Sequence, residues 1–156
     1  MDALNRLLAL AALCSCTSTN WSVGEYATAH GPPGWEGLVS TAVRRWNAAL
    51  LPHCGESAII LGNEGREIRL VSEAAWLAQH GDSTTIGYYN GDVLIREGAP
   101  ATQLAVLVHE LGHAVGLNHV EPAVDARSVM HPKINQHLQW PSDKDVRGAT
   151  RSLGCY

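Results

Sequence analysis

The sequence has no excess of basic residues, no internal repeat and no hydrophobic run long enough to cross a membrane. Its formal net charge is -4 at pH 7, with a pI of about 6.0. It therefore offers no positively charged face to attract phosphates, which argues against nucleic-acid binding. The mixture of 46% hydrophobic and 17% charged residues is that of a globular chain rather than a disordered one. A length of 156 residues fits a single domain with its own core.

The N-terminal segment differs in composition from the rest of the chain. The apolar run of residues 7–13 is too short for a membrane span but suits the hydrophobic core of a signal peptide. The segment Leu13-Cys14-Ser15-Cys16 resembles the lipobox of bacterial lipoproteins, which implies cleavage before Cys16 and a lipid on that residue. We therefore expect residues 1–16 to be a signal region and the protein to be exported, either secreted or anchored to a membrane through Cys16. An apolar N-terminal helix belonging to the domain is the alternative.

Only two cysteines remain outside this N-terminal segment, Cys54 and Cys155. In an oxidising compartment, two remaining cysteines are most simply explained by a disulfide bond, which would tie down the C-terminus. Two free, buried thiols are the alternative. The cysteine pattern thus links the disulfide prediction to the prediction of export.

Three helices are predicted from apolar periodicity and from residues that cap helix ends, at residues 35–50, 100–116 and 143–153. The first is the clearest, because its apolar residues recur at spacings of three and four, and Pro52 with Gly55 is expected to end it. The second opens at Pro100 and Thr102. The third begins behind Ser142, whose hydroxyl can cap it.

Strand-forming residues and turn dipeptides predict one sheet. The candidate strands are four short β-rich runs and an extended N-terminal stretch, at residues 21–29, 58–61, 67–71, 84–89 and 92–97. The dipeptide Asn90-Gly91, between the last two, strongly favours a tight reversal. Residues 72–80 fit either a short helix or a loop. With strands first and two helices late, the order is that of an α+β domain around one sheet.

The second predicted helix carries the residues that point to chemistry. Residues 109–119 read His-Glu-Leu-Gly-His-Ala-Val-Gly-Leu-Asn-His, the extended zinc motif H-E-x-x-H-x-x-G-x-x-H. Side chains four apart on a helix lie nearly in line, because each residue advances about 100°, so His109 and His113 can reach one ion. Gly116 gives the backbone the freedom to turn sharply, which returns His119 to the same ion. These three histidines are the predicted metal ligands.

Three histidine ligands leave a zinc ion with an open coordination position, which is typical of a catalytic rather than a structural site. Such an ion lowers the pKa of water to about 7 and polarises a scissile carbonyl. Glu110 lies next to His109 and is expected to take the proton of the water and deliver it to the leaving amine. The motif therefore predicts a zinc-dependent peptidase with Glu110 as its general base and acid.

The zinc motif is followed by Ser128-Val129-Met130-His131-Pro132, and the two segments together resemble the metzincin clan of zinc peptidases. This resemblance implies that Met130 lies beneath the three histidines as a hydrophobic base. Over residues 84–154 the chain is most similar to the matrixins among metzincins, including the helix that starts near Asp145. The resemblance implies a twisted, mostly parallel sheet with one antiparallel edge strand that binds extended peptides by β-addition. Residues 84–89 are the candidate edge strand.

Several residues depart from the matrixin pattern. Val120 follows the third histidine, where matrixins usually have serine and astacins glutamate. His131 replaces a tyrosine that often follows the methionine, so an oxyanion-stabilising group at that place depends on His131. The segment His80-Gly81-Asp82 resembles part of the matrixin structural-zinc loop but lacks its partner ligands. The pair Cys54 and Cys155 is closer to the astacin arrangement.

We predict an exported, monomeric zinc endopeptidase whose catalytic domain spans residues 17–156 and whose substrates are peptides or proteins in extended conformation. The loop between His119 and Trp140 is expected to set specificity, because in relatives it forms the wall of the main side-chain pocket, and Trp140 is a candidate pocket residue. One catalytic zinc ion is expected; calcium is possible but not indicated. A narrow-specificity peptidase and a zinc-holding, non-proteolytic binding module are the alternatives, and the intact Glu110 argues against the latter.

Overall fold

The computed structural model describes residues 20–81, 84–121 and 123–155. The expected signal region at residues 1–16, with Cys14 and Cys16, lies outside this part of the chain, as does Asp82. Among the described residues, no helix combines the length and apolar character that a membrane crossing requires.

Five strands form one sheet: β1 (Glu25–His30), β2 (Ile59–Leu61), β3 (Arg66–Val71), β4 (Gly87–Tyr89) and β5 (Val93–Arg96). Their order across the sheet is β2-β1-β3-β5-β4. The pairs β1–β2, β1–β3 and β3–β5 are parallel, and β4 is an antiparallel strand at the edge next to β5. The predicted α+β fold, with a mostly parallel sheet and one antiparallel edge strand, is confirmed.

The strands β2 and β3 follow one another along the chain but do not pair, because β1 lies between them. The register shows how so short a connection can achieve this: β2 pairs with β1 from Glu25 to Ala27, and β3 pairs with β1 from Ala27 onward. Residues 62–65 therefore cross β1 near Ala27. Gly65 has a φ of 101°, and a Cβ there would lie 2.0 Å from the carbonyl oxygen of Tyr26, so only glycine fits this crossing.

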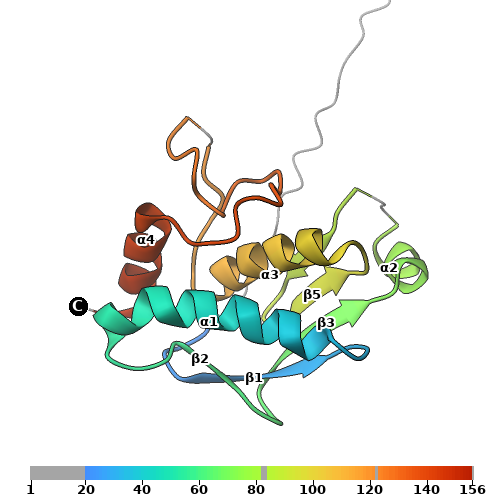
Figure 1. The fold of residues 1–156 in the computed structure, drawn as a ribbon, viewed down its shortest axis with the longest axis horizontal. Coiled ribbons are helices and arrows are strands. Elements are labelled where there is room, and N and C mark those ends of the chain that lie inside the picture. The colour runs from blue at the N-terminus through green and yellow to red at the C-terminus, as the bar shows by residue number, and fades with distance from the viewer. Residues whose placement is uncertain (1–19, 82–83, 122, 156) are drawn as a thin grey trace, which may run out of the picture.

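Four helices complete the fold: α1 (Trp35–Cys54), α2 (Glu73–His80), α3 (Pro100–Ala114) and α4 (Asp143–Leu153). The open alternative at residues 72–80 is settled as a helix, whose N-cap Ser72 accepts a hydrogen bond from the Ala75 amide. Helices α1 and α3 pack side by side on one face of the sheet (Figure 1). The core between these helices and the sheet includes Trp35, Val39, Trp46, Leu50, Ile68, Ile95, Leu107 and Leu111.

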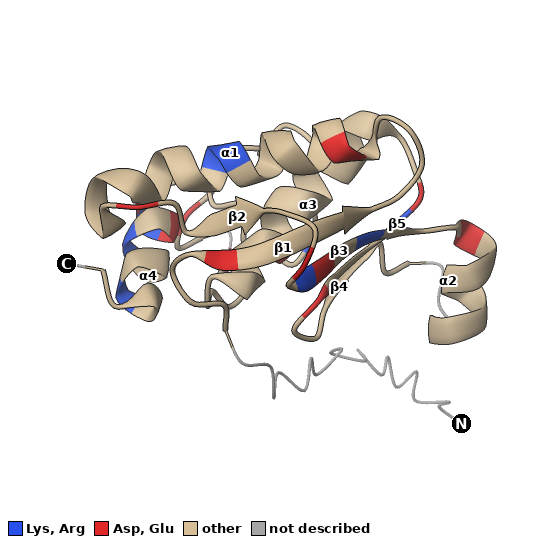
Figure 2. Ribbon diagram, turned by 90° about the horizontal axis from the view of Figure 1, so that it is seen from below, with Lys and Arg blue, Asp and Glu red and all other residues tan. Residues whose placement is uncertain are grey.

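Charged residues lie along β1 and β3 (Figure 2). Arg66 lies 3.8 Å from the carboxylate of Glu25, and Arg69 pairs with Glu67. All four side chains are partly exposed, so these pairs add little to stability. The buried side chains of the strands belong to the same core cluster as those of α3, and this packing positions the active-site helix.

Two predicted boundaries differ most from the structure. Helix α1 ends at Gly55 as expected, with a φ of 75° there, but Pro52 does not stop it and the helix runs through to Cys54. A proline here removes only the hydrogen bond to the carbonyl of Ala48, and that residue is exposed, so solvent can take its place. The first strand is shorter than predicted, because the Trp21 amide bonds to the Ala114 carbonyl at 2.8 Å and its indole to the Gly91 carbonyl at 2.8 Å.

A disulfide joins Cys54, at the end of α1, to Cys155, just after α4, with their Cα atoms 4.7 Å apart. The disulfide expected from the cysteine pattern is therefore present. It holds the C-terminal helix against α1, and the two cysteines are 101 residues apart in sequence.

Removal of this bond is expected to lower the free energy of unfolding by about 2–4 kcal/mol, because closing so long a loop restricts the unfolded chain. The double variant Cys54→Ser/Cys155→Ser, compared with the wild type by chemical denaturation, measures the loss. The wild type treated with a reductant serves as the control and should unfold at the same denaturant concentration as the double variant. Equal stability of the oxidised wild type and the double variant would contradict the prediction.

Candidate active site

The structure brings His109, His113 and His119 together at the C-terminal end of α3. The Nε2 atom of His119 lies 3.2 Å from the Nε2 atoms of both His109 and His113. The ligand atoms of the three residues all lie within 4.8 Å of one another, and no other such metal-binding group is found in the described part of the chain. Three imidazole nitrogens therefore surround one point.

The other ring nitrogens of two of these histidines are held by the backbone. His109 Nδ1 donates to the carbonyl of Val129 at 2.7 Å, and His113 Nδ1 donates to the carbonyl of Leu117 at 2.8 Å. Both protons are then on Nδ1, so the Nε2 lone pairs point toward each other and toward His119. Two lone pairs and the Nε2 atom of His119 thus converge on one point, and this arrangement of nitrogen ligands fits a metal ion.

The protonation of the three rings also suits metal binding. Burial, with a smaller contribution from neighbouring His113, lowers the pKa of His109 to about 3. Burial likewise lowers the pKa of His113 and of His119. A histidine must be neutral to bind a metal. Because their pKa values are lowered, these rings stay neutral at pH values at which a free imidazole would already be protonated.

Gly116 makes the turn that returns the chain to the metal-binding point. Its φ is 92°, and its amide bonds to the carbonyl of His113 at 2.9 Å. A Cβ at this position would lie 1.8 Å from Ser152 Oγ on α4. Both the backbone conformation and the space therefore require glycine, as the sequence motif suggested.

Met130 is fully buried against the active-site helix. A Cβ on Gly112 would lie 2.2 Å from the sulfur of Met130 and 3.2 Å from the ring of Trp46. Met130 and Trp46 of α1 therefore approach α3 at Gly112, directly before His113 in sequence, too closely for a side chain there. The importance of Gly112 was missed by sequence analysis, because it stands at a variable position of the zinc motif.

Asp145 is the second residue whose contribution to the site the sequence analysis did not identify. Its buried carboxylate accepts hydrogen bonds from Ser128 Oγ at 2.6 Å, from the Val129 amide at 3.0 Å and from the Ser142 amide at 2.9 Å. Val129 in turn provides the carbonyl that orients His109. Asp145 thus connects the start of α4 to the segment that holds the first histidine.

Glu110 is almost completely buried, with 6% of its surface exposed. Burial raises its pKa to about 8. A carboxyl group in this environment binds and releases a proton near neutral pH, which suits a general base and acid. A nearby cation would favour its charged form.

Other residues singled out in the sequence have different surroundings. The Nε2 atom of His131 is 2.6 Å from the carbonyl of Asp125, so this ring is bonded to the backbone of its own loop. Trp140 is 59% exposed and stacks on the guanidinium of Arg45 at 4.9 Å. The ring of His80 packs against Trp76 and Tyr88.

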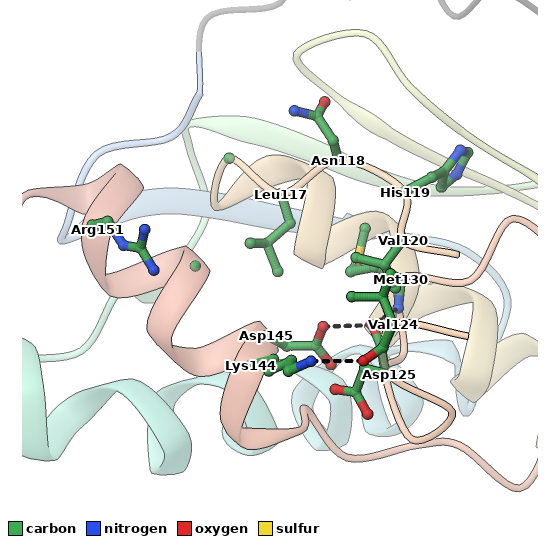
Figure 3. A pocket seen from close by; sticks show the side chains of 13 residues that line it. Leu117, Asn118, His119, Val120, Val124, Asp125, Met130, Lys144, Asp145 and Arg151 are labelled. Carbon is green, nitrogen blue, oxygen red and sulfur yellow. Dashed lines mark hydrogen bonds between the residues drawn. The ribbon is translucent and has the colours of Figure 1, made fainter. Parts of the chain in front are cut away.

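The loop after His119 lines two cavities. The first, of about 350 Å³, lies between this loop and α4 (Figure 3). His119, Val120 and Met130 border it on one side, and Lys144 and Arg151 come from α4. The second, of about 320 Å³, is lined by Arg127 and residues 137–143, including Trp140.

Comparison with known proteins gives three findings. No curated protein sequence matches this chain. Two solved structures of myroilysin have a similar fold: one has a TM-score of 0.54 and 10% identity, covering 90% of this chain and 97% of that one. The other has a TM-score of 0.56 and 11% identity, covering 89% of this chain and 86% of that one. The family model of the matrixins matches residues 57–153. This match spans more than half of the sequence and includes the whole zinc motif, so the chain belongs to the matrixin family of zinc metallopeptidases.

Proposed function

We propose that this protein is a zinc endopeptidase in which His109, His113 and His119 hold the metal and Glu110 is the general base and acid. The convergence of the three Nε2 atoms, with two rings oriented by backbone carbonyls, is the observation that carries the proposal. Three neutral histidine nitrogens are the ligand set of a catalytic zinc site.

A bound zinc ion would supply Lewis acidity, which polarises the scissile carbonyl and lowers the pKa of water. The chain supplies the proton transfers. The carboxylate of Glu110 takes a proton from the attacking water and later gives it to the leaving amine. Its burial excludes bulk solvent from the carboxylate and so limits competing proton exchange.

The position of β4 at the edge of the sheet supports an extended substrate. Within the described part of the chain, this short strand is the last in the sheet order and pairs with β5. A peptide can add there by main-chain hydrogen bonds, which favour affinity without selecting a sequence. Selectivity then depends on side-chain cavities, and the loop from His119 to Trp140 lines both cavities described above.

An extracytoplasmic location and a monomeric state are part of the same proposal. The disulfide between Cys54 and Cys155 supports export, because such bonds persist in oxidising compartments. A lipid on Cys16 would add membrane anchoring, which mass spectrometry of the mature N-terminus can test.

Hydrolysis of a quenched fluorescent peptide library by the purified protein tests the proposed activity. We expect one zinc per chain by mass spectrometry, and cleavage that 1,10-phenanthroline blocks but the non-chelating 1,7 isomer does not. His109→Ala should lose both zinc and activity, whereas His53→Ala, at an exposed histidine in the last turn of α1, should lose neither. Zinc without any cleavage would favour the binding module or a narrow substrate, and an absence of zinc would contradict the proposal.

A further inference from the structure

Gly87 lies in β4 at the place where this strand meets the buried carboxyl group of Glu110. A Cβ on Gly87 would be 2.4 Å from Glu110 Oε1, 2.9 Å from Glu110 Cγ and 2.5 Å from Val106 Cγ1. Val106 and Glu110 are four residues apart on α3, so they form one surface of that helix toward β4. The side chain of Glu110 thus occupies the space that any larger residue at position 87 would need.

The backbone of Gly87 does not itself require glycine. Its φ is not in the left-handed region, so alanine can adopt this conformation without strain. The closest atom to an added methyl group would be the end of the Glu110 side chain, which can move by rotating its own bonds. An alanine at position 87 therefore requires a small shift of Val106, and it is not compatible with the present position of the carboxylate.

We infer that Gly87 is a positioning residue for Glu110: its missing side chain lets the carboxylate lie against the edge strand. This inference rests on the proposed peptidase function. It also assigns β4 a second role, because the strand expected to pair with the substrate also sets the place of the general base.

The variant Gly87→Ala tests the inference through kinetics. A displaced general base impairs the chemical step more than binding, so we expect kcat to fall about tenfold to a hundredfold with KM within about twofold of the wild type. The zinc content, and the visible absorption spectrum of the cobalt-substituted protein, should not change because Gly87 does not contact the histidines. Gly98→Ala is the matched control: no atom lies within 4 Å of its added methyl group, and its φ is also outside the left-handed region.

A double-mutant cycle on stability tests the contact without using activity. Gly87→Ala should lower the denaturation midpoint of the wild type more than that of the Glu110→Ala variant, in which the obstructing atoms of Glu110 are absent and only Val106 remains close. The effect of Gly→Ala on the unfolded chain is the same in both backgrounds and cancels. An equal decrease in both backgrounds, or an unchanged kcat in Gly87→Ala, would overturn the inference. If the wild type and Gly98→Ala do not cleave peptides at all, the proposed function fails, and the stability cycle alone then decides whether Gly87 makes room for Glu110.

Discussion

Replacement of Glu110 by glutamine is expected to lower kcat by about a hundredfold to ten-thousandfold while zinc stays bound. Glutamine keeps the size of the side chain but cannot take a proton from water, and general acid–base groups typically contribute rate factors of this size. None of the three histidines donates a hydrogen bond to Glu110 in the structure described here, so the metal site should not depend on its charge. Peptide hydrolysis and zinc content, measured on the same preparation, give the two required readings.

The matched control is Glu73→Gln, which makes the same change at an exposed position in the first turn of α2. It should retain wild-type activity. Undiminished hydrolysis by Glu110→Gln would show that another group transfers the proton, and loss of zinc would show that Glu110 supports the metal site instead.

The substitution Asp145→Asn is expected to lower stability about as much as removal of the disulfide does. The amide group would place N–H donors where the carboxylate now accepts from the Val129 and Ser142 amides or from Ser128 Oγ. At least one buried donor would lose its acceptor, and hydrogen bonds to charged groups typically contribute about 1.5–3 kcal/mol each. We therefore expect the free energy of unfolding to fall by about 3 kcal/mol, as measured by chemical denaturation.

Zinc affinity should also decrease, by about tenfold or more, because Val129 orients His109 and would no longer be fixed by Asp145. Competition with a fluorescent chelator measures this change. Asp143→Asn is the control, since it alters the same residue type in the first turn of α4 at an exposed position. Equal zinc affinity in the two variants would exclude the proposed connection from Asp145 to His109.

Much of the fold could be predicted because its signals are local. The apolar stripe from Trp35 to Leu50 predicted a long helix, and most residues of that stripe are buried in the core between α1 and the sheet. The reversal at Asn90-Gly91 predicted the pairing of β4 with β5. The crossing of residues 62–65 over β1 could not be predicted, because strand pairing between β1 and β3 depends on contacts far apart in sequence.

The candidate site also has one part that local sequence signals predicted and one part that they did not. The spacing of His109, His113 and His119 follows from helix geometry and one flexible turn, so the sequence alone predicted that they meet. The contributions of Gly87 and Asp145 arise from separate segments that approach α3 only in the folded chain. In the sequence, Gly87 before two tyrosines is an ordinary strand residue. Asp145, three residues after Ser142, is an ordinary residue of a helix N-terminus.

The disulfide between Cys54 and Cys155 also affects how the protein would respond to peptide-bond cleavage. The bond converts the segment between these residues into a covalent ring that contains every predicted metal ligand and Glu110. A single cut in an exposed loop, such as the residues after His119, would leave both fragments attached to each other. A peptidase with such a ring can be nicked, by itself or by a neighbouring molecule, and still keep its active-site histidines on one covalently connected body.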